Sequence, residues 1–378
     1  MTSSPSIPTL TSMRSLPRPD VDRDRRFMAL ALALAERGRG RTNPNPLVGA
    51  VLVSPDGVVV GQGAHLLAGG PHAEVHAITA AGSAARGATL YCTLEPCCHV
   101  GRTGPCVERI AEAGVSRVVT ALEDPNPLVA GKGHQWLRDR GIEVLTGVHT
   151  DAAARQNAPF LTWITRRRPW TLLKTVLSSD GVVAPVDAAS GPQPLRLTGV
   201  ETDRWMHRQR AWVDAIAVGA ATVLTDDPWL TPRGAWRPRP FVRVIVDWRG
   251  RVPPTARVYS TTPAGPVIMV GLDSVPAETV SALKHRGIEV DLYAARDLVE
   301  VGRRLAARGV QSLLVEGGPV LQQAWCDTGC VDAVQWVDTA TPAGAGVAPA
   351  PALVAWKADG NFTRRQSGAD VILEGAWS

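Results

Sequence analysis

Apolar positions along the chain fall into short runs with two spacings, one typical of strands and one typical of helices. Two β-branched runs, at 48–53 and 58–63, flank Ser54-Pro55-Asp56-Gly57, and this pattern predicts a β-hairpin. An alanine- and leucine-rich stretch at 27–35 predicts a helix that ends at Gly38 or Gly40. Further helices are expected at 72–81, 106–113 and 133–140, and further strands at 88–93, 117–122 and 142–145. Strands and helices that alternate at this spacing predict a three-layer α/β unit of about 150 residues.

A second alternating pattern follows residue 170. Strands are expected at 171–177, 215–218, 242–247, 267–270 and 312–315, and helices at 201–210, 277–286, 297–308 and 320–328. The composition changes in the same region, because eleven of the twelve tryptophans lie beyond residue 160. We therefore predict an α/β protein with a flexible N-terminal extension at 1–21, a first domain at 22–150, a linker at 151–169 and a second domain at 170–378, in which 339–351 is a loop.

Length and charge exclude several classes of protein. The chain has 378 residues, of which 45% are hydrophobic and 20% are charged, so it can bury the cores of two domains. No apolar run approaches the roughly 20 residues of a membrane-spanning helix, and the extension lacks the apolar segment of a signal peptide. We therefore expect a cytoplasmic protein. The 40 basic residues exceed the 35 acidic ones only slightly and form short clusters, which is weak evidence for nucleic-acid binding.

The candidate chemistry is concentrated in the first domain. Of the six cysteines, Cys97, Cys98 and Cys106 lie within ten residues, and in a cytoplasmic chain this bunching indicates a metal rather than disulfides. His72 lies upstream, and Cys97 and Cys106 each follow a proline. One imidazole and two thiolates leave a fourth zinc position open for water, which is the arrangement of catalytic sites. Cys106 suits the second thiolate because it begins an expected helix, whose dipole favours an anionic sulfur.

Glu74 stands two residues after His72, near the start of the expected helix. There it can lie beside the metal without binding it, take a proton from the water and deliver it to a departing amine, as in zinc nucleobase deaminases. Zinc lowers the pKa of a bound water toward 7, so hydroxide is available at neutral pH. A structural zinc site is the alternative. We expect Cys98 to point away from the metal, and Cys92, Cys326 and Cys330 to be buried thiols.

Further motifs give the first domain a resemblance to a known family. The nine-residue gap between Cys97 and Cys106 differs from the short Pro-Cys-x-x-Cys spacing of deaminases that act on free cytidine, tRNA or DNA. The other motifs are Pro44-Asn45-Pro46-x-Val48-Gly49-Ala50, Gly63-Ala64-His65 and Asp124-Pro125-Asn126-Pro127-x-Val129-Ala130-Gly131-x-Gly133. With them, residues 22–150 resemble the deaminase half of the RibD family of bifunctional riboflavin biosynthesis proteins, almost without gaps.

This resemblance implies a cytidine-deaminase-like α/β/α fold and removal of the 2-amino group from 2,5-diamino-6-(5-phosphoribosylamino)pyrimidin-4-one. It implies that His72, Cys97 and Cys106 bind Zn²⁺, that Glu74 carries protons, that Asn45 and His65 contact the pyrimidine, and that Arg102, with Thr103 and Lys132, faces the ribose phosphate. The chemistry of Asn45 agrees, because its amide both donates and accepts and the prolines on either side restrict its backbone.

The second domain carries three ordered motifs that resemble the reductase half of the same family. They are Lys174-x-x-x-Ser178-x-Asp180-Gly181, the run from Asp214-Ala215-Ile216 to Leu230-Thr231-x-Arg233, and Val315-Glu316-Gly317-Gly318-Pro319. The resemblance implies a fold similar to dihydrofolate reductase, in which NADPH reduces a ring-opened ribose to a ribityl chain. The chain has no Gly-x-Gly-x-x-Gly, so a Rossmann site has little support.

Candidate roles in the second domain follow from the resemblance and from side-chain chemistry. Cations and hydroxyls suit a ribose phosphate, and bare glycines at strand-to-helix turns expose backbone N–H groups to a cofactor phosphate. The candidates for substrate binding are Lys174, Ser178, Arg196, Arg210 and Arg233. The candidates for cofactor binding are Asp180, Thr198, Gly219, Thr222, Asp226, Glu316, Gly317 and Gly318.

Four positions depart from the family pattern where the family binds substrate and cofactor, namely Arg196, Asp203, Trp205 and Trp248. Asp203 stands where the family has arginine, which reverses the local charge unless Arg196 or Arg204 compensates. We expect a bifunctional enzyme that acts on a small phosphorylated pyrimidine and, like its family, forms a homo-oligomer. An active deaminase with a degenerate or repurposed reductase is one alternative. A nucleic-acid editing protein is another, but the chain lacks the short cysteine motif and a basic stripe with interleaved aromatics.

Overall fold

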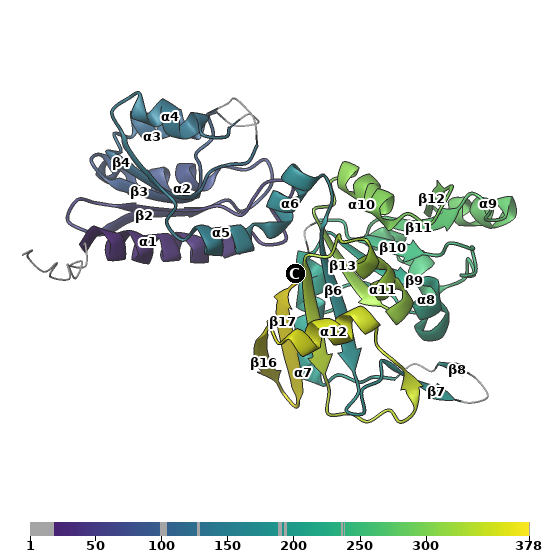
Figure 1. The fold of residues 1–378 in the computed structure, drawn as a ribbon. Coiled ribbons are helices and arrows are strands. Elements are labelled where there is room, and N and C mark those ends of the chain that lie inside the picture. Colours follow the sequence, from purple (N-terminus) through teal and green to yellow (C-terminus); the bar gives the residue numbers. More distant parts are fainter. Residues whose placement is uncertain are drawn as a thin grey trace, which may run out of the picture.

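A computed structural model describes residues 19–98, 104–126, 129–187, 191–192, 195–235, 237 and 239–377. The chain forms two α/β units, and α6 (Ala158–Arg166) lies between them (Figure 1). Each unit is built around one main β-sheet whose faces are covered by helices. The α/β fold class expected from the sequence is confirmed.

Five strands form the sheet of the first unit, within the described residues, in the order β2-β1-β3-β4-β5. The antiparallel hairpin β1–β2 is the one predicted from its turn, β1 also pairs antiparallel with β3, and β3, β4 and β5 run parallel. The elements are α1 (Pro19–Ala35), β1 (Gly49–Val53), β2 (Val59–Ala64), α2 (Ala73–Ala81), β3 (Thr89–Leu94), α3 (Cys106–Glu112), β4 (Arg117–Leu122), α4 (Lys132–Arg138), β5 (Glu143–Thr146) and α5 (Thr150–Gln156).

Alternation along the strands sorts this core into two layers. In β1, Ala50 and Leu52 pack on one face of the sheet with helices α2, α3 and α4, whereas Val51 and Val53 pack on the other with α1 and α5. Side chains point to opposite faces at successive strand positions, so an uninterrupted apolar strand needs a helical layer on each side. The result is the three-layer arrangement that the spacing predicted (Figure 1).

Helices α1 and α2 rest directly on glycines of the sheet. A Cβ at Gly49 would lie 1.9 Å from the carbonyl oxygen of Ala31 in α1, and a Cβ at Gly61 would lie 2.2 Å from that of Ala77 in α2. A third glycine, Gly63, faces the first turn of α2 in the same way, with 2.1 Å to the carbonyl oxygen of Ala73. The absence of side chains at these positions therefore sets how closely α2 approaches the sheet.

The sheet of the second unit has nine strands among the described residues, in the order β12-β11-β10-β9-β13-β6-β14-β17-β16. The first seven strands in this order, from β12 through β11, β10, β9, β13 and β6 to β14, run parallel. Strands β17 and β16 add an antiparallel edge. The elements are β6 (Trp170–Leu177), β7 (Ala184–Asp187), β8 (Gly191–Pro192), α7 (Val200–Trp212), β9 (Ala215–Gly219), α8 (Ala220–Asp226), β10 (Val242–Val246), β11 (Val267–Leu272), α9 (Ala277–His285), β12 (Glu289–Tyr293), α10 (Leu298–Ala307), β13 (Ser312–Gly317), α11 (Pro319–Asp327), β14 (Ala333–Asp338), β15 (Gly346–Val347), α12 (Pro351–Asp359), β16 (Thr363–Ser367) and β17 (Asp370–Ala376).

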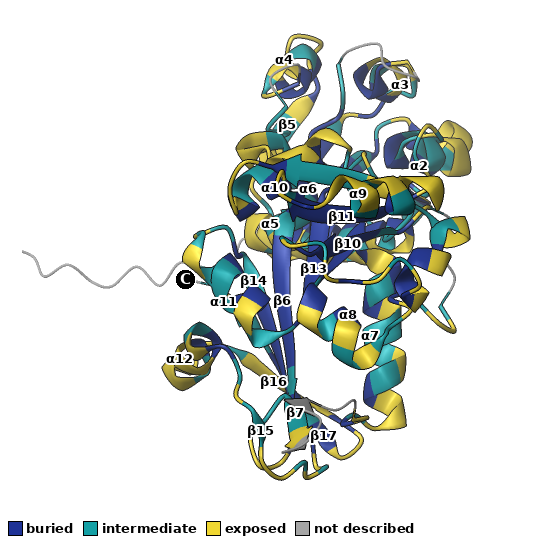
Figure 2. Ribbon diagram, turned by 90° about the vertical axis from the view of Figure 1, so that its right-hand side faces the viewer, coloured by how far each residue is buried: buried dark blue, intermediate teal, exposed yellow. Residues whose placement is uncertain are grey.

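The central parallel strands of this sheet are largely apolar. They are also mostly buried, as Figure 2 shows for β6, β10, β11 and β13. Ala215 and Ala217 belong to the apolar cluster that includes residues of α10, α11 and α12, whereas Ile216 and Val218 belong to the cluster that includes residues of α8 and α9. All strands and helices predicted for this domain are present, with ends shifted by a few residues. The short strand β15 interrupts the predicted loop at 339–351, because it pairs with β7.

The predicted linker at 151–169 is largely helical. Helix α5 packs on β4 of the first unit through Ala153, and α6 packs on β6 of the second. Trp163 in α6 donates from Nε1 to the carbonyl oxygen of Ala306, at 3.0 Å. In the part of the chain that the structure describes, no helix has the length and apolar character needed to cross a membrane.

Gly61→Ala is expected to lower the free energy of unfolding by about 1–3 kcal/mol, the usual cost of overpacking. The added methyl group would overlap the backbone of α2, which cannot move without disturbing the packing of the helix. Urea unfolding followed by circular dichroism measures the change. Gly302→Ala in α10 is the matched control, since its Cβ would meet nothing closer than 3.8 Å. That variant is expected to keep or raise stability, by up to about 1 kcal/mol. Equal stability of both variants would contradict the argument from close approach.

Candidate functional site

Three side chains of types that bind metal ions meet where two helices of the first unit begin. His72 is the N-cap of α2, Cys106 is the first residue of α3, and Cys97 lies in the loop after β3. The Nδ1 atom of His72 lies 3.2 Å from Sγ of Cys106 and 3.6 Å from Sγ of Cys97, and the three ligand atoms all lie within 4.8 Å of one another. Tetrahedral zinc, with bonds of about 2.3 Å to sulfur and about 2.0 Å to nitrogen, needs N···S separations of about 3.5 Å. The donor set and its spacing therefore fit zinc.

The surroundings of Cys97 favour a thiolate. Hydrogen bonds from the Cys106 side chain and from His72 lower the pKa of Cys97, and the backbone N–H of Cys106 donates to its sulfur at 3.4 Å. Cys98 is half-buried and packs instead against the apolar cluster of this face. Cys92 is buried, as expected. The expectation of buried thiols is wrong for Cys326 and Cys330, which are half-buried because they lie near the solvent-facing end of α11.

Glu74 lies in the first turn of α2, directly after the His72 cap, and is buried. Burial raises the pKa of its carboxyl group above the usual range. Its Oε2 atom has no hydrogen-bond partner among the described residues. A buried polar atom without a partner costs free energy unless a ligand satisfies it. This oxygen is therefore placed to exchange a proton with a group that enters the site.

Asn45 and His65, predicted to contact a pyrimidine, form a pair beside the three ligands. The Nδ1 atom of His65 lies 3.0 Å from the carbonyl oxygen of Pro71, and its Nε2 lies 3.0 Å from Nδ2 of Asn45. Burial lowers the pKa of His65, so the neutral ring donates from Nδ1 and accepts the Asn45 amide N–H at Nε2. The amide of Asn45 is thereby oriented, with its oxygen left to accept. The rings of His65 and His72 meet edge to face, with centroids 5.3 Å apart.

Arg102 and Thr103, predicted to face a phosphate, lie outside the described residues. Lys132, the third member of that group, is the first residue of α4.

A second cluster of potential metal ligands, Glu95, Glu123 and His134, has a different function. The Glu95 carboxylate accepts four backbone N–H groups of the loop before and at the start of α4, from Asp124, Gly131, Gly133 and His134, at 2.8–3.2 Å. A carboxylate with its acceptor positions filled in this way is a loop anchor rather than a metal ligand. Sequence reasoning missed Glu95; the signal was an acidic residue directly after a strand, in a chain with glycines 131 and 133 downstream.

In the second unit, two basic side chains that were predicted to bind substrate both pair with one acidic side chain that was predicted to bind the cofactor. The Glu316 side chain at the end of β13 is 7% exposed and lies between Lys174 of β6, whose Nζ lies 2.8 Å from Oε1, and Arg210 of α7, whose Nε donates to Oε1 at 2.8 Å. Burial alone would raise the pKa of Glu316, but the two cations lower it below its usual range. Two positive charges against one negative charge leave this group with a net positive charge. It can therefore attract an anion or stabilise negative charge that develops on a bound molecule.

Glycines begin two helices beside this ionic group. Gly219 is the N-cap of α8 after β9, and Gly318 is the N-cap of α11 after β13; neither cap has a side-chain hydrogen bond to the helix. Strands β9 and β13 are neighbours, so both helix starts lie at the same edge of the sheet. Thr222 approaches the glycine pair, since its Oγ1 would lie 3.2 Å from a Cβ at Gly317 and 3.4 Å from one at Gly318. Backbone N–H groups at paired helix starts fit the phosphates of a nucleotide cofactor.

The remaining predicted residues of this unit lie in three other places. Ser178 donates to Asp180 at 2.5 Å, and Asp180 accepts the backbone N–H groups of Ala343 and Gly344, so this pair anchors a loop. Arg196 and Thr198 both bind the carboxylate of Asp203. The backbone N–H of Arg233 donates to Nδ1 of His207 at 3.2 Å, and Asp226 ends α8, where burial raises its pKa.

Two side chains around Lys174 were not predicted. Gln322 of α11 is buried and donates to the carbonyl oxygen of Lys174 at 2.7 Å, and the Nζ atom of Lys174 lies 3.3 Å from Sδ of Met206. Nearby, burial and the Arg210 and Arg233 charges lower the pKa of His207 to about 4. The sequence gives no sign that Gln322 or Met206 contacts Lys174, because these contacts depend on how α7 and α11 cross the sheet.

Comparison with known proteins connects both groups of residues to one family. Residues 21–122 match the cytidine and deoxycytidylate deaminase zinc-binding region, and residues 169–348 match the RibD C-terminal domain. Riboflavin biosynthesis protein RibD of Aquifex aeolicus is 40% identical over 289 residues, covering 76% of this chain and 79% of that protein. RibD of Escherichia coli is 40% identical over 303 residues, with 76% and 79% covered.

Solved structures agree over most of the chain. RibD of Acinetobacter baumannii has a TM-score of 0.79 and 35% sequence identity, and the match covers 94% of this chain and 99% of that one. A diaminohydroxyphosphoribosylaminopyrimidine deaminase/5-amino-6-(5-phosphoribosylamino)uracil reductase from Thermotoga maritima has a TM-score of 0.78 and 31% identity, with the same coverage.

Cys97→Ser is expected to abolish stoichiometric zinc binding, because it removes one of the two thiolates in the donor set. Metal analysis of the purified variant, expressed with added zinc, measures the content. Cys98→Ser is the matched control, since the neighbouring thiol packs in the apolar cluster and should leave one zinc per chain. Loss of zinc in the Cys98 variant and retention in the Cys97 variant would reverse the assignment.

Proposed function

Because this chain belongs to the RibD family of riboflavin biosynthesis proteins, we propose roles for its residues in the two reactions of that family. It is a bifunctional enzyme. One reaction is the zinc-dependent hydrolytic deamination of 2,5-diamino-6-(5-phosphoribosylamino)pyrimidin-4-one, and the other is the NADPH-dependent reduction of the ribosyl side chain to ribityl. None of the relatives described above favours a degenerate or repurposed reductase.

For the deaminase, we assign zinc binding to His72, Cys97 and Cys106. Zinc held there acts as a Lewis acid that makes a water molecule acidic near neutral pH. Glu74 takes a proton from the attacking water and returns a proton to the departing amine, so that a C–O bond replaces the C–N bond and ammonia leaves. The observation that carries this role is the unpartnered Oε2 atom of a buried Glu74, which lies in the first turn of α2, two residues after His72.

Asn45 and His65 are assigned to the pyrimidine. The neutral ring of His65 accepts one N–H of the Asn45 amide and is itself held by the Pro71 carbonyl group, so the Asn45 oxygen points in one direction before substrate arrives. An acceptor fixed in advance recognises a ring N–H or amino group without the entropic cost of ordering it on binding. Arg102 remains a candidate for binding the ribose phosphate because of its position in the sequence motif.

For the reductase, Lys174, Arg210 and Arg233 are assigned to the phosphorylated ribose chain, with Ser178 and Arg196 as candidates at its edge. The buried pair Lys174–Glu316, together with Arg210, carries the assignment, because it keeps a net positive charge in place at the sheet edge. NADPH supplies the hydride, so the residues need only align the acceptor carbon and stabilise charge on its oxygen.

The cofactor is assigned to the same edge of the sheet. Gly219, Gly317 and Gly318 leave backbone N–H groups accessible at the starts of α8 and α11, and Thr222 lies against the glycine pair. Thr198, Asp226 and Glu316 remain candidates for contacts to the cofactor. Asp180 is assigned an indirect role in cofactor binding, because its carboxylate anchors the loop at Ala343 and Gly344.

The cellular setting follows from the chemistry. Two of the three assigned zinc ligands are thiols, which a reducing compartment keeps available, so we place the enzyme in the cytoplasm. The substrate is a small phosphorylated pyrimidine, and we propose no nucleic-acid or membrane partner. The family resemblance supports a homo-oligomer, and light scattering of the purified protein tests it.

Glu74→Gln is expected to keep one zinc per chain and to reduce deamination by at least about 100-fold, because glutamine keeps the shape but cannot carry the proton. Mass spectrometry of the products, with metal analysis of the same sample, measures both. NADPH-dependent reduction of separately supplied deaminated intermediate serves as the internal control and should be unchanged. Substantial remaining deamination would remove Glu74 from the proton transfer.

Lys174→Met is expected to spare deamination and to lower NADPH-dependent reduction by at least about tenfold, because it removes one of two cations from a buried charged group. Oxidation of NADPH in the presence of deaminated intermediate measures the effect. Lys357→Met in the same unit is the matched control, since that lysine pairs with Asp338 at the surface. Equal loss of both activities in the Lys174 variant would argue against two separate sites.

A further inference from the structure

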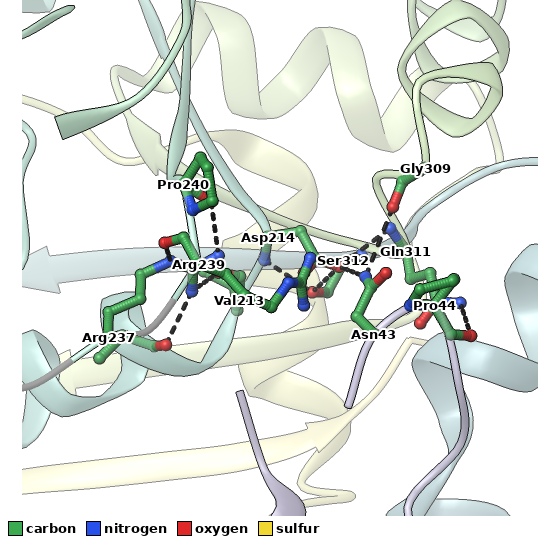
Figure 3. Close-up of polar contacts among 11 residues, drawn as sticks. Asn43, Pro44, Val213, Asp214, Arg237, Arg239, Pro240, Gly309, Gln311 and Ser312 are labelled. Atoms are coloured by element: carbon green, nitrogen blue, oxygen red, sulfur yellow. Dashed lines mark hydrogen bonds and ion pairs between the residues drawn. The ribbon is translucent and has the colours of Figure 1, made fainter. Parts of the chain in front are cut away.

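Residues of the second unit form hydrogen bonds with the loop that carries Asn45. Asn43 donates from Nδ2 to Oδ2 of Asp214 at 2.6 Å and to the carbonyl oxygen of Gly309 at 3.4 Å, and Gln311 donates from Nε2 to the carbonyl oxygen of Pro44 at 2.8 Å (Figure 3). These contacts join residues more than 170 positions apart in the chain. They act on the two residues directly before Asn45.

The anchor that holds this loop is itself rigid. Asp214 is buried, and its Oδ2 also accepts the backbone N–H groups of Gln311 and Ser312, at 3.0 and 3.1 Å, and the Ser312 hydroxyl at 3.0 Å. Its other oxygen pairs with Arg239 at 3.0 Å. Asp214 precedes β9 and Gln311 precedes β13, which are neighbouring strands in the middle of the large sheet. The loop is therefore held by two buried side chains that lie at the amino ends of central strands, and not by surface side chains.

The backbone before Asp214 is held as well. Arg237 donates from Nη1 to the carbonyl oxygen of Val213 at 2.5 Å (Figure 3), and to that of Ala211 at 2.7 Å. Asn45 and Asp214 both line a small cavity of about 60 Å³ between the two units. On its far side the loop is held by the buried Asn157, which accepts from the Leu47 backbone N–H at 2.8 Å and donates to its carbonyl oxygen at 2.9 Å.

From this loop a chain of contacts leads to the zinc ligands. The backbone N–H of Asn45 donates to the Thr42 carbonyl oxygen at 2.8 Å, which closes the turn that Asn43 and Pro44 form. The side chain of Asn45 then meets His65, which is held by Pro71, the residue before His72. A shift of the Asn43–Pro44 backbone would therefore move the Asn45 amide relative to the deaminase site.

We infer that Asp214 and Gln311, which lie in the reductase unit, are positioning residues for deamination. They hold the Asn43–Pro44 backbone so that Asn45 and His65 present a fixed hydrogen-bonding edge to the pyrimidine. The deaminase site is thereby completed by contacts from the other unit of the chain, although neither Asp214 nor Gln311 touches substrate. This inference rests on the proposed role of Asn45 in substrate binding.

The test is Gln311→Met in the full-length, zinc-loaded enzyme. Methionine keeps the length of the side chain but removes the donor to Pro44, so the KM for deamination is expected to rise about three- to tenfold, as for the loss of one hydrogen bond, with zinc content unchanged. Reduction of separately supplied deaminated intermediate is expected to keep its wild-type kcat and KM, because Gln311 lies at the opposite ends of the strands from the Lys174 group.

Gln335→Met is the matched control. Gln335 is equally buried in the same unit and donates one hydrogen bond to Glu374 at 2.8 Å, on a strand away from the first unit. It should leave the KM for deamination unchanged. Asn43→Asp is a second variant, which keeps the shape of the side chain but faces the Asp214 carboxylate with a like charge. It is expected to raise the KM for deamination more than Asn43→Ala, which only removes the donor.

Asn45→Ala separates this inference from the function on which it rests. If Asn45→Ala raises the KM for deamination while Gln311→Met and Asn43→Asp do not, Asn45 binds substrate but the contacts from the second unit do not position it, and the inference is wrong. If Asn45→Ala has no effect either, the proposed role of Asn45 fails and the inference fails with it. Loss of zinc, or an equal loss of both activities, in Gln311→Met would also overturn it, because the contact would then be purely structural.

Discussion

The close approach of α2 to the first sheet is the constraint on which the deaminase site depends. Gly61 and Gly63 carry no side chains, so the backbone of α2 rests on β2, and the helix begins beside the end of the hairpin. That placement sets His72 at the N-cap and Glu74 in the first turn. Helix α3 packs on the same face, so Cys106 at its start meets His72. The positions of the proposed ligands and of the proposed proton carrier therefore depend on helix packing as much as on the sequence motif.

The second unit uses the two ends of its sheet for different tasks. Toward the carboxyl ends of β6, β9 and β13 lie Lys174, Glu316 and the glycine-led helix starts, which suit an anionic substrate and a nucleotide. At the amino ends of β9 and β13 lie Asp214 and Gln311, which face the first unit. Parallel strands make this division possible, because all their carboxyl ends meet at one edge. The same sheet thus carries the proposed reductase site at one edge and contacts the Asn43–Pro44 backbone at the other.

The sequence predicted what depends on neighbours along the chain and missed what depends on the fold. The hairpin, the helices with their glycine ends and the cysteine cluster are local patterns, and the structure contains them. Strands β12, β14, β16 and β17 were not predicted. The clearest case is β16, whose five residues are all polar, so that its sequence has no apolar pattern and its pairing with β17 stabilises it instead. The contacts of Glu95, Gln322 and Gln311 were missed for the same reason, since each joins distant segments.

The departures from the family pattern show how a local change of charge can be absorbed. Asp203, in place of arginine, would by itself add a negative charge near Lys174 and Arg210. Burial lowers the pKa of Lys174 below its usual value, and the Asp203 charge acts against that effect. Against the effect of burial, the Glu316 charge, with a smaller effect of Asp203, raises the pKa of Arg210. Arg196, in place of tryptophan, pairs with that same carboxylate, so the two exchanged residues neutralise each other. Trp205 lies under Arg365, and Trp248 packs edge to face on Tyr293. The four substitutions are thus held by partners within the unit, and the net positive charge of the Lys174, Arg210 and Glu316 group is preserved. The proposed reductase site therefore keeps two cations beside two helix starts that have no side-chain cap, an arrangement that suits phosphate binding.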